Sequence, residues 1–176
     1  MKNYILIISL FLTTIIAFPQ TKKVSQVKVD DKITRYFINY ENGLPTLTTN
    51  KYGSLKFYLE KYVEIVDDKK TERYNILFNF DEDLIKSLNK DIFVTVVFTD
   101  YSIINARPSL EKEGAVKGTI TMPIRNIDRI ASTSIKTIIF KNKDESDDND
   151  IIFKFEKNDT GNQKFKIDAL LLKNAK

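Results

Sequence analysis

Carboxylates gather between residues 142 and 150, which read NKDESDDND. Five acids fall within seven residues, and four of them are aspartates, whose oxygens could bind a hard cation such as Ca²⁺. The four are Asp144, Asp147, Asp148 and Asp150. An EF-hand loop counted from Asp144 fails, because Asn149 stands where glycine is needed and Phe155 stands where a bidentate glutamate is needed. The stretch is interpreted either as a weak calcium site or as a solvated hairpin tip. The hairpin tip is favoured, because Asp, Asn and Ser bond the local backbone in turns.

Two tyrosines flank a glutamate in SLKFYLEKYVEIV, residues 54–66. If this stretch is a strand, Tyr58, Glu60 and Tyr62 share the face opposite its most apolar residues. Tyrosines beside hydrogen-bonding groups can stack on sugars or anchor a protein partner. The alternative is that they pack against neighbouring strands or under a loop. These three residues are the candidate binding residues for a protein or a glycan.

The chain contains no histidine and no cysteine. It therefore lacks the groups that a Ser-His-Asp triad, a Cys-His pair or a typical zinc site requires. A glycosidase could use two carboxyl groups about 5 to 9.5 Å apart. Glu60 and Glu64 would lie about 13 Å apart on one strand face, and Glu111 and Glu113 fall in a predicted loop. A carboxylate-based hydrolase acting on polysaccharide is therefore an alternative function rather than the leading one.

The first 20 residues have the pattern of an export signal. Lys2 precedes an apolar or hydroxyl run of 14 residues from Ile5 to Phe18, which is followed by polar residues. This run is shorter than the roughly 20 residues that a spanning helix needs, and no cysteine follows it to carry a lipid anchor. The sequence predicts a signal peptide at residues 1–20, removed from a periplasmic or secreted protein that keeps no membrane span.

Residues 21–176 are predicted to form a single β-rich domain, and their number suits one hydrophobic core. The formal charge of the whole chain is +4, and the basic residues are scattered. This distribution argues against nucleic acid as a partner, since such proteins concentrate Lys and Arg on one face. Without cysteine, the domain must rely on packing rather than on disulfides, which fits a bacterial periplasm or exterior. No cofactor is expected apart from the calcium considered above.

Alternation of apolar and polar residues predicts strands along most of the domain. The predicted strands are 27–29, 33–40, 74–80, 116–122, 134–141, 151–155 and 165–171. The stretch IFVTVVF at 92–98 is apolar on both sides, so we expect a central strand that is covered on both faces. Residues 104–115 are predicted to be a polar loop within the domain.

Residues 54–66 fit both a helical and a strand pattern. A helix here would place Lys56 at its positive end and Glu64 at its negative end, the reverse of what the helix dipole favours. The β-branched Val63 and Ile65 also prefer a pleated surface. We therefore predict a strand.

Short helices are predicted where the alternation breaks, at 81–89 and at 123–131. In the second stretch Pro123 is expected to open the turn that begins the helix. Residues 158–161, which read NDTG, are interpreted as a turn completed by its glycine.

The Tyr-rich pair SLKFYLEKYVEIV and RYNILFNF is followed by NKDIFVTVVF, by PIRNIDRIA and by SIKTIIFK. In layout this order resembles small exported bacterial β-rich domains of unknown role, over roughly residues 54–156. The resemblance implies a sandwich-like fold and brings no catalytic residue.

Together the patterns predict an all-β domain of two packed antiparallel sheets, rather than a closed barrel, with one or two short helices. The expected function is that of an exported, non-enzymatic module that binds a protein or glycan through a sheet face or an edge strand. The alternatives are the carboxylate-based hydrolase and a calcium-stabilised structural domain.

Overall fold

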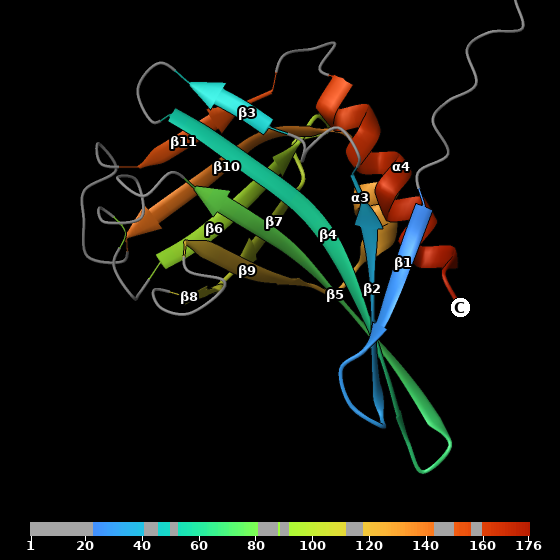
Figure 1. Ribbon diagram of the computed structural model, residues 1–176. Helices are drawn as coiled ribbons and strands as arrows, with labels where there is room; N and C mark the ends of the chain where they lie inside the picture. Colours follow the sequence, from blue (N-terminus) through green and yellow to red (C-terminus); the bar gives the residue numbers. More distant parts are fainter. Residues whose placement is uncertain are drawn as a thin grey trace, which may run out of the picture.

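The computed structural model describes residues 23–40, 46–49, 53–80, 88, 92–111, 118–142, 150–155 and 160–176. These residues form two antiparallel sheets that do not close into a barrel, together with two helices (Figure 1). The predicted two-sheet, all-β fold is therefore confirmed. The signal peptide predicted at 1–20 lies outside the described residues, as does the helix predicted at 81–89 except for its buried Leu88.

The larger sheet has seven strands. Its order is β1 (Lys23–Lys28), β2 (Ile33–Asn39), β4 (Gly53–Val66), β5 (Lys69–Phe80), β9 (Thr119–Ile124) and β8 (Ser109–Glu111), and β3 (Thr46–Thr49) pairs with the first part of β4. The smaller sheet has the order β11 (Ile151–Lys154), β10 (Ile135–Asn142), β6 (Ile92–Phe98) and β7 (Ile103–Ala106). The stretch 54–66 lies in β4, so the strand prediction for it is confirmed.

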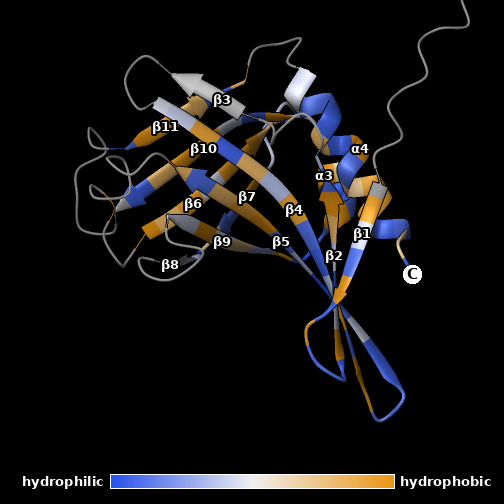
Figure 2. Ribbon diagram, in the orientation of Figure 1, coloured by the Kyte–Doolittle hydropathy of each residue, from blue (hydrophilic) through white to orange (hydrophobic). Residues whose placement is uncertain are grey.

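The longest strand pair, β4 and β5, is joined by a turn of two aspartates. Asp67 and Asp68 have φ values of 48° and 60°, which is the backbone of a type I′ hairpin turn. Asp tolerates this left-handed region better than most residues. The end of this hairpin extends beyond the body of the sandwich together with the end of β1 and β2 (Figure 1). Both projecting ends mix apolar and hydrophilic residues (Figure 2).

The core lies between the inner faces of the two sheets and is rich in phenylalanine. Phe140 of the smaller sheet contacts Phe78 and Phe80 of the larger sheet edge to face, with ring centroids 5.2 and 4.8 Å apart. All three side chains are buried. Such T-shaped contacts add to the free energy gained by burying the rings.

Helices α3 (Ile127–Ser132) and α4 (Thr160–Asn174) lie against each other near β1 and β2 (Figure 1). The ring of Phe165 in α4 lies 5.0 Å from that of Phe57 in β4. Asn162 in the first turn of α4 makes two hydrogen bonds with the backbone of Ile135, of 2.8 and 2.7 Å. These contacts fix α4 on the open end of the core.

The strand predicted at 165–171 is wrong, because these residues belong to α4. Phe165, Asp168, Ala169 and Leu172 are buried, and their spacing of three, four and seven residues is that of one helix face. Ile167, which the strand pattern would bury, is 51% exposed. The turn predicted at 158–161 is also wrong in its second half, since the helix begins at residue 160. Its first half lies outside the described residues.

Three further predictions need correction. The loop predicted at 104–115 contains most of β7 and all of β8. Pro123 does not open a helix but lies in β9 opposite Asn75, and α3 begins at Ile127. Strand β6 is central in its sheet, as predicted, but only one of its faces is fully buried and the other is half-buried.

Candidate functional site

The outer face of the larger sheet carries the tyrosines singled out in the sequence. Leu55, Phe57 and Leu59 point into the core, so the even-numbered residues of β4 point away from it. Tyr58, Glu60 and Tyr62 therefore share one face, and the structure brings all three together as the alternation predicted.

Strand register places basic and apolar residues beside these tyrosines. Val27, Arg35, Tyr62 and Arg73 form one row across β1, β2, β4 and β5. Phe37, Glu60 and Asn75 form the next row. Cross-strand neighbours on one face lie about 4.5–5.5 Å apart at their Cβ atoms, so these side chains form a continuous surface. We call it the Tyr62 face, defined by these seven residues and Tyr58.

An ion pair lies at the centre of the Tyr62 face. The guanidinium of Arg35 contacts the carboxylate of Glu60, and the hydroxyl of Tyr62 donates a 2.9 Å hydrogen bond to the other carboxylate oxygen. Glu60 is only 1% exposed, whereas the Arg35 side chain is 35% exposed. The guanidinium also lies 5.2 Å from the centre of the Phe37 ring, within cation–π range. The arginine and tyrosine thus screen a buried carboxylate from solvent.

Burial and this ion pair together shift the pKa values on the Tyr62 face. Burial and the charge of Glu60 raise the pKa of Tyr62 to about 12, and the hydrogen bond to Glu60 acts in the same direction. Burial and the same charge raise the pKa of Tyr58. Burial acts to lower the pKa of Arg35, but its contact with Glu60 outweighs this and raises it. Both phenols therefore keep their protons at neutral pH, and Arg35 keeps its charge.

A hollow of about 590 Å³ adjoins the Tyr62 face where β9 ends. Its lining is Tyr62, Glu72, Arg73, Tyr74, Asn75, Pro123, Ile124 and Arg125. It arises because β9 pairs with β5 only from Tyr74 to Asn79. No other strand in the described ranges pairs with the outer edge of β5 from Lys69 to Arg73. Two guanidiniums, a carboxylate, an amide and two aromatic rings thus line an open depression.

On the inner face of β4, a lysine holds the end of α4. Lys61 is 1% exposed and forms a 3.1 Å ion pair with Glu72. Its ammonium donates to the carbonyl oxygens of Ala175 at 2.9 Å and Lys173 at 3.4 Å. A positive charge is favourable at a helix C-terminus, where carbonyl groups lack helical partners. Hydrogen bonding to Lys70, followed by Tyr74 and Lys61, lowers the pKa of Glu72 to about 2.

The sequence did not single out Arg35, Phe37 or Arg73. The alternation in β2 places Arg35 and Phe37 on one face, but it does not say which residues of another strand lie beside them. That pairing comes from the register between β2 and β4. The missing signal is therefore tertiary rather than local.

The two described carboxylates that were considered for catalysis are both engaged in ion pairs. Glu60 is held by Arg35 and Tyr62, and Glu64 forms a 3.1 Å ion pair with Arg73. The side chain of Glu111 and all of Glu113 lie outside the described residues.

Of the four aspartates considered as calcium ligands, Asp144, Asp147 and Asp148 lie outside the described residues, and Asp150 directly precedes β11. Within the part of the chain that is described, no three His, Cys, Asp or Glu side chains lie close enough together to hold a metal ion. Neither α3 nor α4 is long and apolar enough to cross a bilayer, and these are the helices of the described ranges.

Comparison with known proteins gives no family: no protein-family profile, no curated protein and no solved structure matches the chain significantly.

Proposed function

We propose that the chain is an exported, non-enzymatic binding module whose ligand, a protein or a glycan, binds the Tyr62 face. The observation that carries this proposal is the row in which Tyr62 lies between Arg35 and Arg73, next to the hollow at the end of β9. Tyrosine and arginine are the residue types, along with tryptophan, that most often supply binding energy in interfaces.

The ion pair under the surface favours binding because it orders the groups that a ligand would meet. The hydroxyl of Tyr62 is bonded to Glu60, which limits rotation of the phenol ring. Ordering a side chain on binding costs about 0.5–1.5 kcal/mol, and this cost is reduced where folding has already ordered the ring. Arg73 is 57% exposed and remains accessible despite its pairing with Glu64. The face thus offers an ordered ring beside an accessible hydrogen-bond donor.

The ligand that fits is one with an apolar or planar part and acceptor oxygens. The ring of Tyr62 and the exposed Val27 offer apolar contact, whereas Arg73, Arg125 and Asn75 offer N–H donors. A sugar or a peptide segment has both features. Both are therefore tested.

The experiment uses two substitutions at one position. Tyr62→Thr removes the ring but keeps a β-branched residue suited to a strand, whereas Tyr62→Phe keeps the ring and removes the hydroxyl. Wild type and both variants are tested on a glycan array and for capture of proteins from the envelope fraction of the native cell. We expect Tyr62→Phe to retain a ligand that Tyr62→Thr loses. A ligand set that is identical for wild type and Tyr62→Thr would contradict the proposal.

A further inference from the structure

The turn between β6 and β7 presents an aromatic side chain to solvent. Tyr101 is 73% exposed and Ile103, at the start of β7, is 56% exposed, the highest values among the large apolar residues that the structure describes. The φ angle of Tyr101 is 64°. This left-handed region is unfavourable for a bulky residue. The chain therefore displays Tyr101 at a conformational cost, without gaining burial of its ring.

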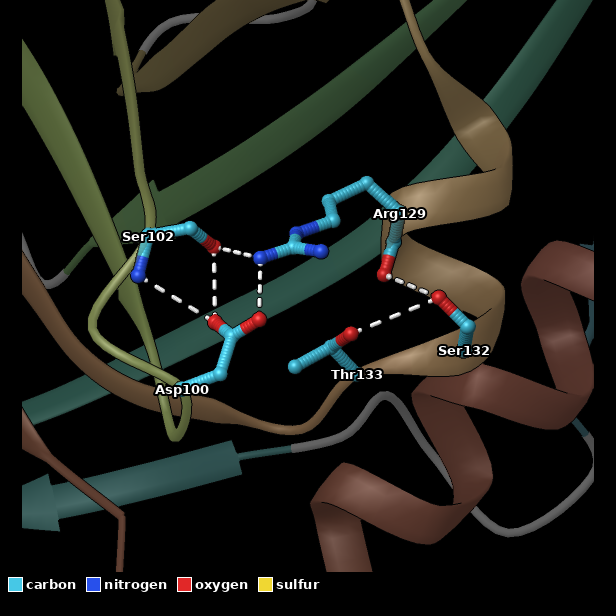
Figure 3. A network of polar contacts seen from close by, with 5 residues as sticks. All are labelled: Asp100, Ser102, Arg129, Ser132 and Thr133. Carbon is cyan, nitrogen blue, oxygen red and sulfur yellow. Dashed lines mark hydrogen bonds and ion pairs between the residues drawn. The ribbon is translucent and has the colours of Figure 1, made fainter.

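Polar contacts hold this turn in one conformation. The backbone N–H of Tyr101 donates to the carbonyl oxygen of Phe98 at 3.0 Å. The backbone N–H of Phe98 donates to the carbonyl oxygen of Ser102 at 2.9 Å. The carboxylate of Asp100 accepts from the amide of Ser102 at 3.1 Å and from its hydroxyl at 2.7 Å. Arg129 of α3 bonds to both Asp100 and Ser102, as Figure 3 shows. The turn is thus braced by a helix that follows it in the chain by 25 residues or more.

The charge around the turn is positive. Asp100, its acidic residue, is paired with Arg129. The ammonium of Lys136 lies 4.4 Å from the centre of the Tyr101 ring. Strand register aligns Ile103 of β7 with one residue each in β6 and β10 and then with Lys154 of β11. The side chain of Lys154 is exposed. One lysine thus lies against the Tyr101 ring, a second lies on the same sheet three strands from Ile103, and the nearby carboxylate is neutralised.

The projecting ends of the two hairpins provide a contrast within the same molecule. Val29 and Ile65 are 55% and 54% exposed, so similar apolar surface is available there. Their turns, however, carry Asp30, Asp31, Asp67 and Asp68 among the lysines. An anionic surface would repel those carboxylates, which makes the β6–β7 turn the better match for it.

We propose that the β6–β7 turn docks onto an anionic lipid surface, with Tyr101 and Ile103 in the boundary between headgroups and acyl chains and with Lys136 and Lys154 against acidic headgroups. Tyrosine suits this boundary because its ring is apolar and its hydroxyl is polar. Lysines near the surface are attracted to acidic lipids. A turn with projecting apolar groups can insert into the surface of a bilayer, whereas a protein partner would need a cavity to receive it. Docking onto a bilayer surface needs no membrane-spanning segment.

The test measures co-sedimentation with vesicles of equal parts phosphatidylglycerol and phosphatidylcholine, and with vesicles of phosphatidylcholine alone. The protein is purified as the cell processes it, and its N-terminus is read by mass spectrometry so that all variants are compared in the same form. The turn variant combines Tyr101→Asn, which tolerates the left-handed backbone, with Ile103→Ser. The matched control combines Val29→Ser with Ile65→Ser. Circular dichroism checks that each variant is folded.

We expect wild type to bind the anionic vesicles more tightly than the neutral ones and to release as salt is raised. The turn variant should bind about tenfold or more weakly, and Lys136→Gln or Lys154→Gln about fivefold more weakly at low salt. The hairpin control should bind as wild type does. Failure to bind anionic vesicles, equal binding to neutral ones, or an equal loss in the control would overturn the proposal.

Discussion

Replacing Arg35 with methionine should reveal how much the ion pair on the Tyr62 face stabilises the fold. Glu60 is 1% exposed. After the change, the hydroxyl of Tyr62 is the one that remains of the two side-chain contacts of Glu60 described above. Breaking a fully buried ion pair in this way costs about 3–5 kcal/mol. Because Arg35 is 35% exposed, solvent already screens part of the interaction, and we expect a loss of about 2–3 kcal/mol. For a chain of this size that lowers the melting temperature by about 4–12 °C.

The assay is urea unfolding at pH 7 followed by circular dichroism, because the chain has no tryptophan. The double variant Arg35→Met, Glu60→Leu provides the control. Replacing both members of a buried pair by apolar residues is often neutral, so the double variant should be more stable than Arg35→Met alone. The reasoning is refuted if Arg35→Met unfolds within about 0.5 kcal/mol of wild type, or if the second substitution restores nothing.

Three further changes test the other charged contacts. Hydrogen bonding to Lys70, and to Tyr74 and Lys61, lowers the pKa of Glu72 from 4.5 to about 2. The stability that ionised Glu72 contributes should therefore be complete above pH 4.5 and be lost as the pH falls towards 2. Its partial exposure limits this to about 1 kcal/mol, and Glu72→Gln should flatten the acid limb of a stability–pH curve. Glu60→Gln should lower the pKa of Tyr62 from about 12, because it removes the charge of Glu60, while burial should keep this pKa above 10. Ultraviolet titration against Tyr62→Phe measures the change, and an unchanged titration would contradict the contribution of Glu60. Lys61→Met should destabilise the fold by about 2 kcal/mol and speed hydrogen exchange in the last turn of α4, and unchanged exchange there would argue against the proposed anchor.

Most of the larger sheet could be predicted because its strands have one buried and one open face. In β4 the buried positions alternate almost without exception from Leu55 to Val63, which is the pattern that a half-buried strand imposes. Lys61 breaks the apolar pattern, and its burial depends on carbonyl groups at the end of α4. The sequence indicates the strand but cannot indicate where such a charge finds its partners.

The sequence of α4 predicts a strand because the buried face of the helix contains an acid. Asp168 is fully buried, and the hydroxyl of Tyr40 donates a 2.5 Å hydrogen bond to it. Tyr40 lies 128 residues earlier in the chain, so no local pattern could show that this position is internal. With Asp168 counted as polar, the remaining apolar residues fit alternation as well as helical spacing.

Local sequence predicts the part of the candidate site that lies on one strand, but not the part that depends on strand pairing. Tyr58, Glu60 and Tyr62 share a face by alternation within one strand. Arg35 and Arg73 join them through the pairing of three strands, which depends on register and not on local sequence. The turn that displays Tyr101 carries no motif, and its geometry depends on Arg129 of α3.

Helix α4 follows every described strand in the chain, and this order affects how the core can form during synthesis. Phe57 packs against Phe165, and Phe165 and Leu172 are buried core residues that follow every described strand in the chain. A nascent chain that stops before residue 160 contains the sequence of every described strand but lacks the side chains that cover this part of the core. The core can therefore be completed only once residues 160–174 have left the ribosome, and until then the exposed apolar surface is open to chaperones or to aggregation.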